Sequence, residues 1–232
     1  MTSSASPSGE ALGGAGLLRL LQLTSPSFPT GTFAYSEGLE AAVDAGWVSS
    51  EESAEAWISG QLAFALPHLE VPLFRRYYEA WTAEDFERVA YWVERQIAFR
   101  EARELREEDA KVGRALQHAL AALDVPFAEA FTGPITWLAA YALGASQAGA
   151  PLRAAAQAAL YAWCENQALA ASRLVPLGQK ATQRVLGRCL ALVPEVVERG
   201  LVVPDDALGR SAPGHSLACV AHETQYTRLF LS

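Results

Sequence analysis

The residues best suited to chemistry lie late in the chain, where His222 and Glu223 open a segment similar to the zinc-protease pattern HExxH. In that pattern two histidines four residues apart share one helix face and bind one zinc ion. Tyr226 stands where the second histidine belongs. His215, seven residues upstream, is the nearest other histidine. One hypothesis is therefore a small all-α metal-dependent enzyme that uses His215 and His222.

Other sequence patterns with a known chemistry are missing. The chain has no GxxxxGK[ST] loop for nucleotide phosphates, no GxGxxG and no GxSxG. His68 and His118 stand alone, and the three cysteines (Cys164, Cys189 and Cys219) are far apart. Such cysteines predict neither a disulfide framework nor a zinc site, and they fit a reducing cytoplasm. The sequence therefore favours an interaction protein, without catalytic, metal or cofactor sites, over an enzyme.

The composition limits both the partners and the architecture. The 232 residues carry a net charge of −8, which opposes binding to nucleic acid or to an anionic membrane, because both require clustered Lys and Arg. Hydrophobic residues make up 51% of the chain, enough for one substantial core. No uncharged apolar run reaches the roughly 18 residues of a membrane-spanning helix. No basic and apolar signal segment opens the chain.

Apolar residues recur at helical spacing along most of the chain, and no segment alternates with the period of a strand. We expect an all-α fold, a single-domain bundle of about ten helices, over residues 17–232. Residues 1–16, rich in Ser, Gly, Pro and Ala, predict a disordered leader. Residues 204–232 predict a mobile loop followed by an apolar C-terminal tail, which either docks on its own core or binds a partner.

Several helices have features that can be checked. Residues 49–53 predict a serine-capped helix start. Arg100 with Glu104 and Arg103 with Glu107 predict i,i+4 ion pairs on a solvated helix face. Residues 125–149 predict one helix, kinked or split at Pro134. The alanine-rich segment 151–174 predicts a central or dimer-forming helix.

The stretch from Ser25 to Glu40, SPSFPTGTFAYSEGLE, joins two helical runs through an elbow. Its two prolines favour extended geometry, and Gly31 permits a left-handed turn. A helix is expected to restart after Thr32, so that Phe33 and Glu37 share one face. Spacing alone leaves open whether this elbow is an ordinary loop or a binding platform.

Four blocks in order give the chain a resemblance to a known family. They are LLRLLQLTSPSFPTGTFAYSEGLEAAVDAGWV, FREARELREEDAKVGRAL, LYAWCENQALAASRLVPLGQKATQRVL and HETQYTRLFLS. Together they resemble the UreF-type urease accessory proteins from Leu17 onward. The departures are small: Thr32 and Ala34 in the first block, and Lys180 and Thr182 in the third.

The resemblance implies an all-α, dimeric, cytoplasmic scaffold for nickel insertion into urease. It implies that the chain binds a second accessory protein, called UreD or UreH. The pair would recruit the nickel-carrying GTPase UreG to apo-urease and gate its GTPase, so that nickel and GTP belong to the partner. It also implies that the elbow and the tail reorganise when UreD/UreH binds. The partner-binding residues that it implies are Phe33, Tyr35, Ser36, Glu40, Gln179, Gln183, Arg184, His222, Arg228, Leu229 and Phe230.

Overall fold

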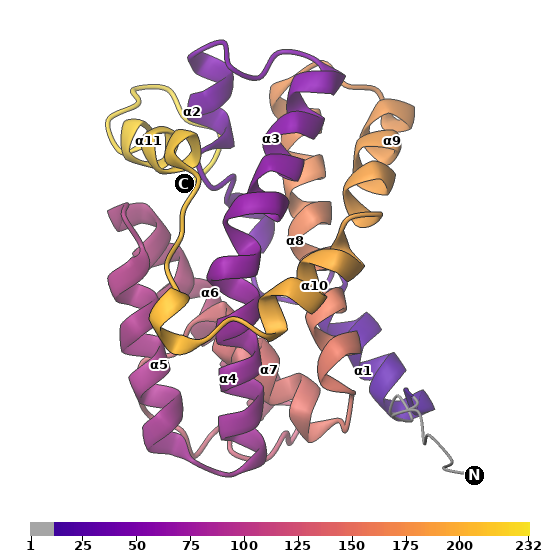
Figure 1. The fold of residues 1–232 in the computed structure, drawn as a ribbon, viewed down its shortest axis with the longest axis vertical. Helices are drawn as coiled ribbons and strands as arrows, with labels where there is room; N and C mark the ends of the chain where they lie inside the picture. The colour runs from indigo at the N-terminus through magenta and orange to yellow at the C-terminus, as the bar shows by residue number, and fades with distance from the viewer. Residues whose placement is uncertain (1–11) are drawn as a thin grey trace, which may run out of the picture.

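The computed structural model describes residues 12–232, and these contain α-helices, short 3-10 turns and no strand. The expected all-α fold is confirmed. Figure 1 shows one bundle, with the elements labelled in chain order. The elements are α1 Gly14–Thr24, η1 Thr32–Ala34, α2 Leu39–Asp44, α3 Glu51–Phe64, η2 Leu66–His68, α4 Glu70–Thr82, α5 Phe86–Phe99, α6 Arg103–Ala121, α7 Trp137–Gln147, α8 Leu152–Leu174, α9 Gln179–Leu190, α10 Val193–Leu201, η3 Asp205–Ala207 and α11 Pro213–His222.

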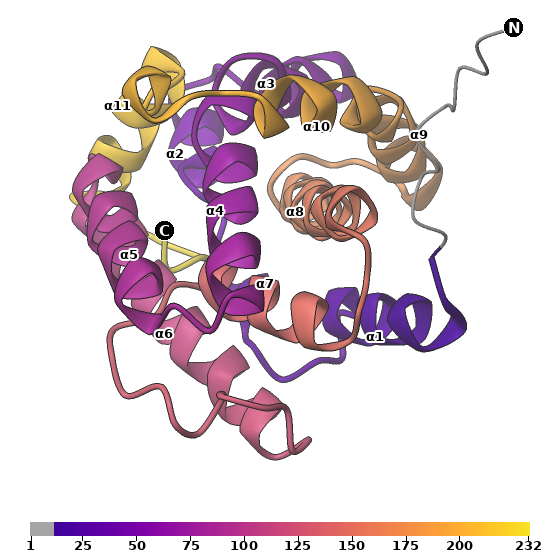
Figure 2. The same cartoon turned by 60° about the horizontal axis from the view of Figure 1, so that its bottom comes forward.

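Helix α8 is the axis of the bundle. Figure 2 looks nearly along it and shows α1, α3, α4, α7, α9 and α10 arranged around it. Its buried side chains are mostly alanines, and these let the surrounding helices approach closely. The alanine-rich segment is therefore the central helix. Dimer formation by this chain stays a prediction.

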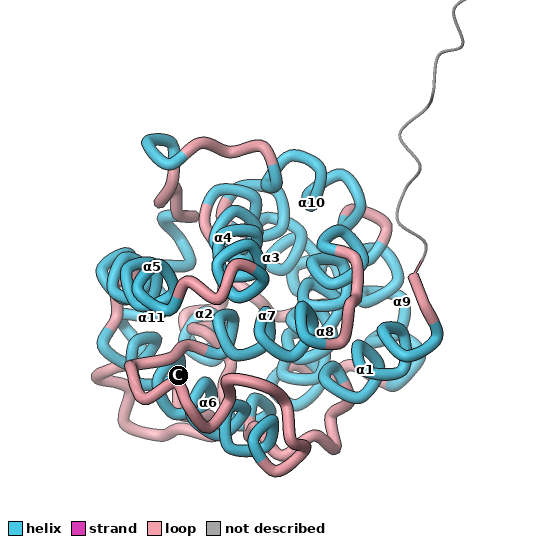
Figure 3. The backbone as a smooth tube through the Cα atoms, turned by 90° about the horizontal axis from the view of Figure 1, so that it is seen from below, coloured by secondary structure: helices cyan, strands magenta, loops and turns pink. Residues whose placement is uncertain are grey.

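Three expected element boundaries are wrong. Helix α1 begins at Gly14, three residues before the expected start, while residues 1–11 of the expected leader lie outside the described part. Residues 125–149 are not one helix, because turns run to Thr136 and α7 begins at Trp137. The segment expected to be a mobile loop contains η3 and the ten-residue helix α11. Figure 3 shows these loops against the helices.

One expected ion pair is also wrong. Helix α5 ends at Phe99, so Arg100 precedes α6 and does not share its surface with Glu104. Arg100 instead turns inward and pairs with Glu70 at 2.9 Å and with Asp109 at 2.7 Å. The expected pair of Arg103 with Glu107 is present. Because Arg100 lies in the turn between α5 and α6, its side chain points into the protein and not onto a solvated helix face.

The predicted cap of α3 offers a direct test of local stability. The Ser50 hydroxyl accepts from the Ser53 N–H, and the Ser53 hydroxyl accepts from the Ser50 N–H. Ser50→Ala leaves the first of these donors unpaired, and we expect it to lower the free energy of unfolding by about 1 kcal/mol. Urea unfolding followed by circular dichroism measures the change. A loss no greater than that of the control Ser59→Ala, at a half-buried serine further along α3, would contradict the capping role.

Candidate functional site

The elbow and the last residues of the chain form one unit, although almost 200 positions separate them. The Ser36 backbone N–H and hydroxyl both donate to the Ser232 carbonyl, at 3.0 and 2.5 Å. The Leu231 N–H donates to the Ala34 carbonyl at 2.8 Å. Figure 3 shows the C-terminus beside α2 and α6. The tail thus docks on its own chain, one of the two outcomes left open by the sequence.

The elbow reaches this geometry through left-handed backbone rather than through a helix. Gly31 has φ of 78° and Gly38 has φ of 77°, a region that favours glycine. A Cβ on Gly38 would lie 2.8 Å from the backbone nitrogen and the sulfur of Cys219, so this glycine also lets α11 approach α2. Helix α2 begins only at Leu39. The expectation that Phe33 and Glu37 share a helix face is therefore wrong.

Below this junction lies a buried cluster of charges. The ring nitrogens of His222 lie between two carboxylates, with Nδ1 2.6 Å from Glu104 and Nε2 3.2 Å from Glu40. The Arg228 guanidinium donates to the second oxygen of Glu104 at 2.6 Å. His222, Glu40 and Glu104 are buried. Helices α2, α6 and α11 and the tail are therefore joined through one network.

Glu40 also holds the tail backbone directly. Its carboxylate accepts from the N–H of Leu229 at 2.6 Å and from the N–H of Phe230 at 2.9 Å. Hydrogen bonds to an ionised acceptor are stronger than those between neutral groups. The name tail latch is used below for Glu40, Glu104, His222 and Arg228 together with the two N–H groups that Glu40 binds.

The latch orients the tail so that alternate side chains point in and out. Phe230 is buried in a small core with residues of α2, α3 and α8, and the Arg173 guanidinium lies 5.9 Å from its ring centroid. Leu229 is 63% exposed and Leu231 is 57% exposed. The term tail surface denotes the exposed apolar residues of α11 and the tail: Leu217, Val220, Tyr226, Leu229 and Leu231.

The remaining predicted site residues lie in the elbow and on α9. Tyr35 is buried and its carbonyl accepts from Asn166 of α8, whereas the neighbouring Phe33 is exposed. Three of these residues lie on α9: Gln179, Gln183 and Arg184. The Arg184 guanidinium pairs with Glu51 of α3.

Sequence reasoning missed Glu104, which is central to the latch, because its segment resembled a solvated face. The pattern did hold a signal. Leu105, Val112 and Leu116 mark the buried stripe of α6, and Glu104 and Asp109 fall on or beside that stripe. A carboxylate at a core position requires a partner, so this placement alone predicts a buried ion pair.

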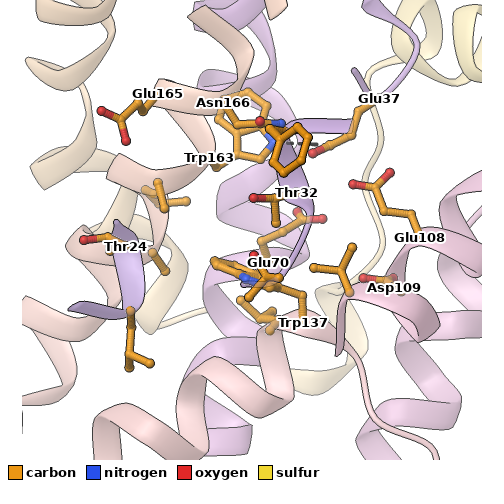
Figure 4. A pocket seen from close by; sticks show the side chains of 18 of the residues that line it. Thr24, Thr32, Glu37, Glu70, Glu108, Asp109, Trp137, Trp163, Glu165 and Asn166 are labelled. Carbon is orange, nitrogen blue, oxygen red and sulfur yellow. Dashed lines mark hydrogen bonds between the residues drawn. The ribbon is translucent and has the colours of Figure 1, made fainter. Parts of the chain in front are cut away.

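A cavity of about 130 Å³ is lined by apolar side chains and by several carboxyl groups, among them Glu37, Glu108 and Asp109. Figure 4 shows Glu37 and Glu108 on the same side of it, with Asp109 close to Glu108. The Trp163 indole donates to Glu37 at 3.1 Å. The Ser232 hydroxyl donates to Glu108 at 2.8 Å and accepts from the Glu37 N–H at 3.3 Å. The end of the tail therefore bridges the carboxyl group of Glu108 and the backbone of Glu37.

Burial changes the acidity of both groups. It raises the pKa of Glu37 to about 7, although the Arg100 charge opposes the shift. Burial, reinforced by the nearby Glu37, raises the pKa of Glu108 well above its ordinary value. The cavity thus holds carboxyl groups that are protonated in a pH range where exposed carboxylates are ionised.

The two histidines of the metal-enzyme hypothesis serve separate contacts. Both ring nitrogens of His222 face carboxylates, which leaves neither free for a metal. His215 faces the Cys219 sulfur at 3.4 Å. Within residues 12–232, no group of three or more His, Cys, Asp or Glu side chains is arranged to hold a metal ion. No helix in the same residues is long and apolar enough to cross a bilayer.

Comparison with known proteins places this chain in the class of urease accessory proteins. The family model UreF matches residues 48–190. A urease accessory protein UreF of Alkalilimnicola ehrlichii is 46% identical over 216 residues, covering 92% of this chain and 95% of the relative. Proteins of the same name from Hahella chejuensis and Chromohalobacter salexigens are 38% and 39% identical, each over 93% of this chain and at least 94% of the relative. The chain belongs to the UreF family, as the four blocks predicted.

Proposed function

We propose that this chain is a non-enzymatic scaffold for urease activation, acting in the cytoplasm as a homodimer. In this proposal it binds the UreD/UreH accessory protein. The pair then recruits the GTPase UreG to apo-urease and gates its GTP hydrolysis. UreG carries the nickel and the GTP, and this chain holds neither. Membership of the UreF family, whose named relatives are urease accessory proteins, supports this role.

The observation that carries the proposal is the tail surface. Its five exposed apolar residues lie on α11 and on the tail, and Glu40 of the latch holds the tail backbone at Leu229 and Phe230. Exposed apolar side chains on an ordered backbone are typical of protein interfaces, because the cost of ordering the segment is met before binding. UreD/UreH is therefore proposed to bind here. Of these two predicted partner-binding residues, Leu229 faces outward, whereas Phe230 is buried and anchors the tail to its own chain.

The test is capture of UreD/UreH by a variant with a charged tail surface. Leu229→Asp removes an exposed apolar contact and adds a charge that would be desolvated in the complex, so we expect affinity to fall by at least about a hundredfold. Leu18→Asp is the matched control, because Leu18 is a similarly exposed leucine on α1, at the opposite end of the molecule from α11 (Figure 1). Co-purification and biolayer interferometry measure the affinities. Equal capture by both variants would contradict the proposal.

A further inference from the structure

Two arginines and a histidine meet on the surface where α3 is followed by η2 and α4. Arg199 of α10 donates to the Ala63 carbonyl near the end of α3 at 3.2 Å. The Gly209 N–H donates to the His68 carbonyl at 3.0 Å, which fixes the loop that carries Arg210 against η2. Burial lowers the pKa of His68, and the charges of Arg210 and Arg199 lower it further. The name basic patch is used below for His68, Arg199 and Arg210.

The basic patch has no acidic counterpart on its own chain. Within residues 12–232, neither exposed arginine of the patch forms an ion pair, and Glu198, next to Arg199 on α10, pairs with Arg153 instead. The Nδ1 atom of His68 is buried and has no hydrogen-bond partner. A proton there would be an unpaired buried donor, so the neutral ring carries its proton on Nε2, which is not buried. The patch therefore offers two guanidinium groups and one N–H, all of them donors.

Exposed apolar side chains lie beside these donors. Phe64 ends α3 directly after the residue that Arg199 contacts, and Val202 follows α10. Both side chains are exposed. Protein interfaces are enriched in arginine and in aromatic residues. A protein segment that carries carboxylates would gain both ion pairs and apolar contacts here, whereas a free small anion would gain only the ion pairs.

The basic patch is continuous along the chain with the tail surface. Arg210 lies three residues before α11, the helix that carries Leu217 and Val220 of the tail surface. Figure 1 shows the loop from α10 crossing the front of the bundle and rising to α11. A stable interface takes about 20 to 30 residues from each partner, so the tail surface alone is too small to be the whole contact. A partner on the tail surface therefore covers neighbouring surface as well.

The charge of the patch decides which kind of surface can cover it. Apolar or basic surface laid over Arg199 and Arg210 would remove two charges from water without compensation, which is strongly unfavourable. Carboxylates compensate both charges, and each can accept from a guanidinium in bidentate geometry. The rest of the chain repels an acidic partner, since the net charge is −8, so attraction at the patch also orients that partner.

We propose that the basic patch extends the tail surface, and that UreD/UreH binds it with an acidic segment. This inference rests on the proposed function, which places UreD/UreH on the tail surface. The carboxylates of that segment accept from Arg199 and Arg210, and one of them also accepts from the Nε2 N–H of His68. Apolar side chains beside those carboxylates contact Phe64 and Val202.

The experiment is the association rate of UreD/UreH with the full chain, measured by biolayer interferometry at two salt concentrations. The double variant Arg199→Gln/Arg210→Gln removes both charges and keeps amide donors in their place. Attraction between charges speeds association, and salt screens it. We expect the double variant to associate at least about tenfold more slowly than the wild type at about 50 mM NaCl, and within about threefold of it at about 1 M NaCl. Equal rates for the two proteins at both concentrations would overturn the proposal.

The matched control is Arg19→Gln/Arg88→Gln, which changes the net charge by the same amount at two arginines of α1 and α5. Arg19 donates to the Gln22 amide and Arg88 lies over the Trp92 ring, so neither charge has a carboxylate partner within residues 12–232. This control should associate within about twofold of the wild-type rate, because exposed charges more than a Debye length from the contact are screened. A control as slow as the patch variant would show that net charge alone sets the rate, and would overturn the proposal.

Binding of free phosphate is the alternative use of the same donors. Phosphate at about 5 mM, with the ionic strength held constant by chloride, should slow association no more than chloride does. A block by phosphate in the wild type that is absent from Arg199→Gln/Arg210→Gln would overturn the proposal in favour of a small-anion site.

Failure of this inference and failure of the proposed function give different results. Capture of UreD/UreH that is lost in Leu229→Asp and unchanged in the patch variant would overturn the inference alone. Equal capture by Leu229→Asp and Leu18→Asp, with slow association of the patch variant, would contradict the tail surface and support an acidic segment on the patch.

Discussion

Glu40→Ala is expected to detach the tail from α2 and to weaken capture of UreD/UreH by about a hundredfold. The substitution removes the acceptor of two tail N–H groups and one of the two carboxylates that face His222. Each buried donor left unpaired costs about 1–3 kcal/mol, so we expect the docked state of the tail to lose about 3 kcal/mol in total. Since about 1.4 kcal/mol corresponds to a factor of ten, the tail would be docked about a hundredfold less often.

Two measurements separate docking of the tail from binding of the partner. Hydrogen exchange at Leu229 and Phe230 reports docking in the free protein, and interferometry with UreD/UreH reports binding. Glu107→Ala is the matched control, because Glu107 is a carboxylate of α6 whose ion pairs are exposed. Unchanged amide protection in Glu40→Ala would contradict the latch. Lost protection with normal capture would instead contradict the role of the tail surface.

Gly113→Ala is expected to have the largest effect on the fold. A Cβ at this position of α6 would lie 2.4 Å from the Ile135 carbonyl oxygen and 2.5 Å from the Thr136 carbonyl carbon. Both are backbone atoms, so no side-chain rotation relieves the overlap. We expect a loss of at least about 3 kcal/mol, which lowers the melting temperature by about 6 to 12 °C in a chain of this size.

Gly187→Ala is the matched control for this prediction. Gly187 lies within α9, and a Cβ there meets no atom within 4 Å. Alanine has the better helix propensity, so this variant should gain about 0.5 to 1 kcal/mol. The melting temperatures of both variants, measured by calorimetry, test these two predictions. A Gly113→Ala protein as stable as the wild type would show that the Ile135–Thr136 backbone can move away from α6.

Local patterns predicted most helices because their causes are local. Ser50 caps α3 through atoms three residues away, and the apolar stripe of α6 follows from a 3.6-residue period. Errors arose where a distant contact decided the backbone. The turn segment before α7 runs against Gly113, and Arg100 meets Glu70, which is 30 residues away. The spacing of nearby residues predicts neither contact.

By itself, the sequence determined the helical class, the absence of nucleotide-binding motifs and, through four ordered blocks, the UreF family. Only the tertiary structure decided that Glu104 and His222, 118 positions apart, form one buried pair, and that the tail is held by Glu40 of the elbow. The physical reason is that the sequence of a charged helix does not show which of its carboxylates are buried, because burial depends on the partner that compensates the charge. That partner is set by how α2, α6 and α11 pack, and packing of distant segments is a property of the whole fold.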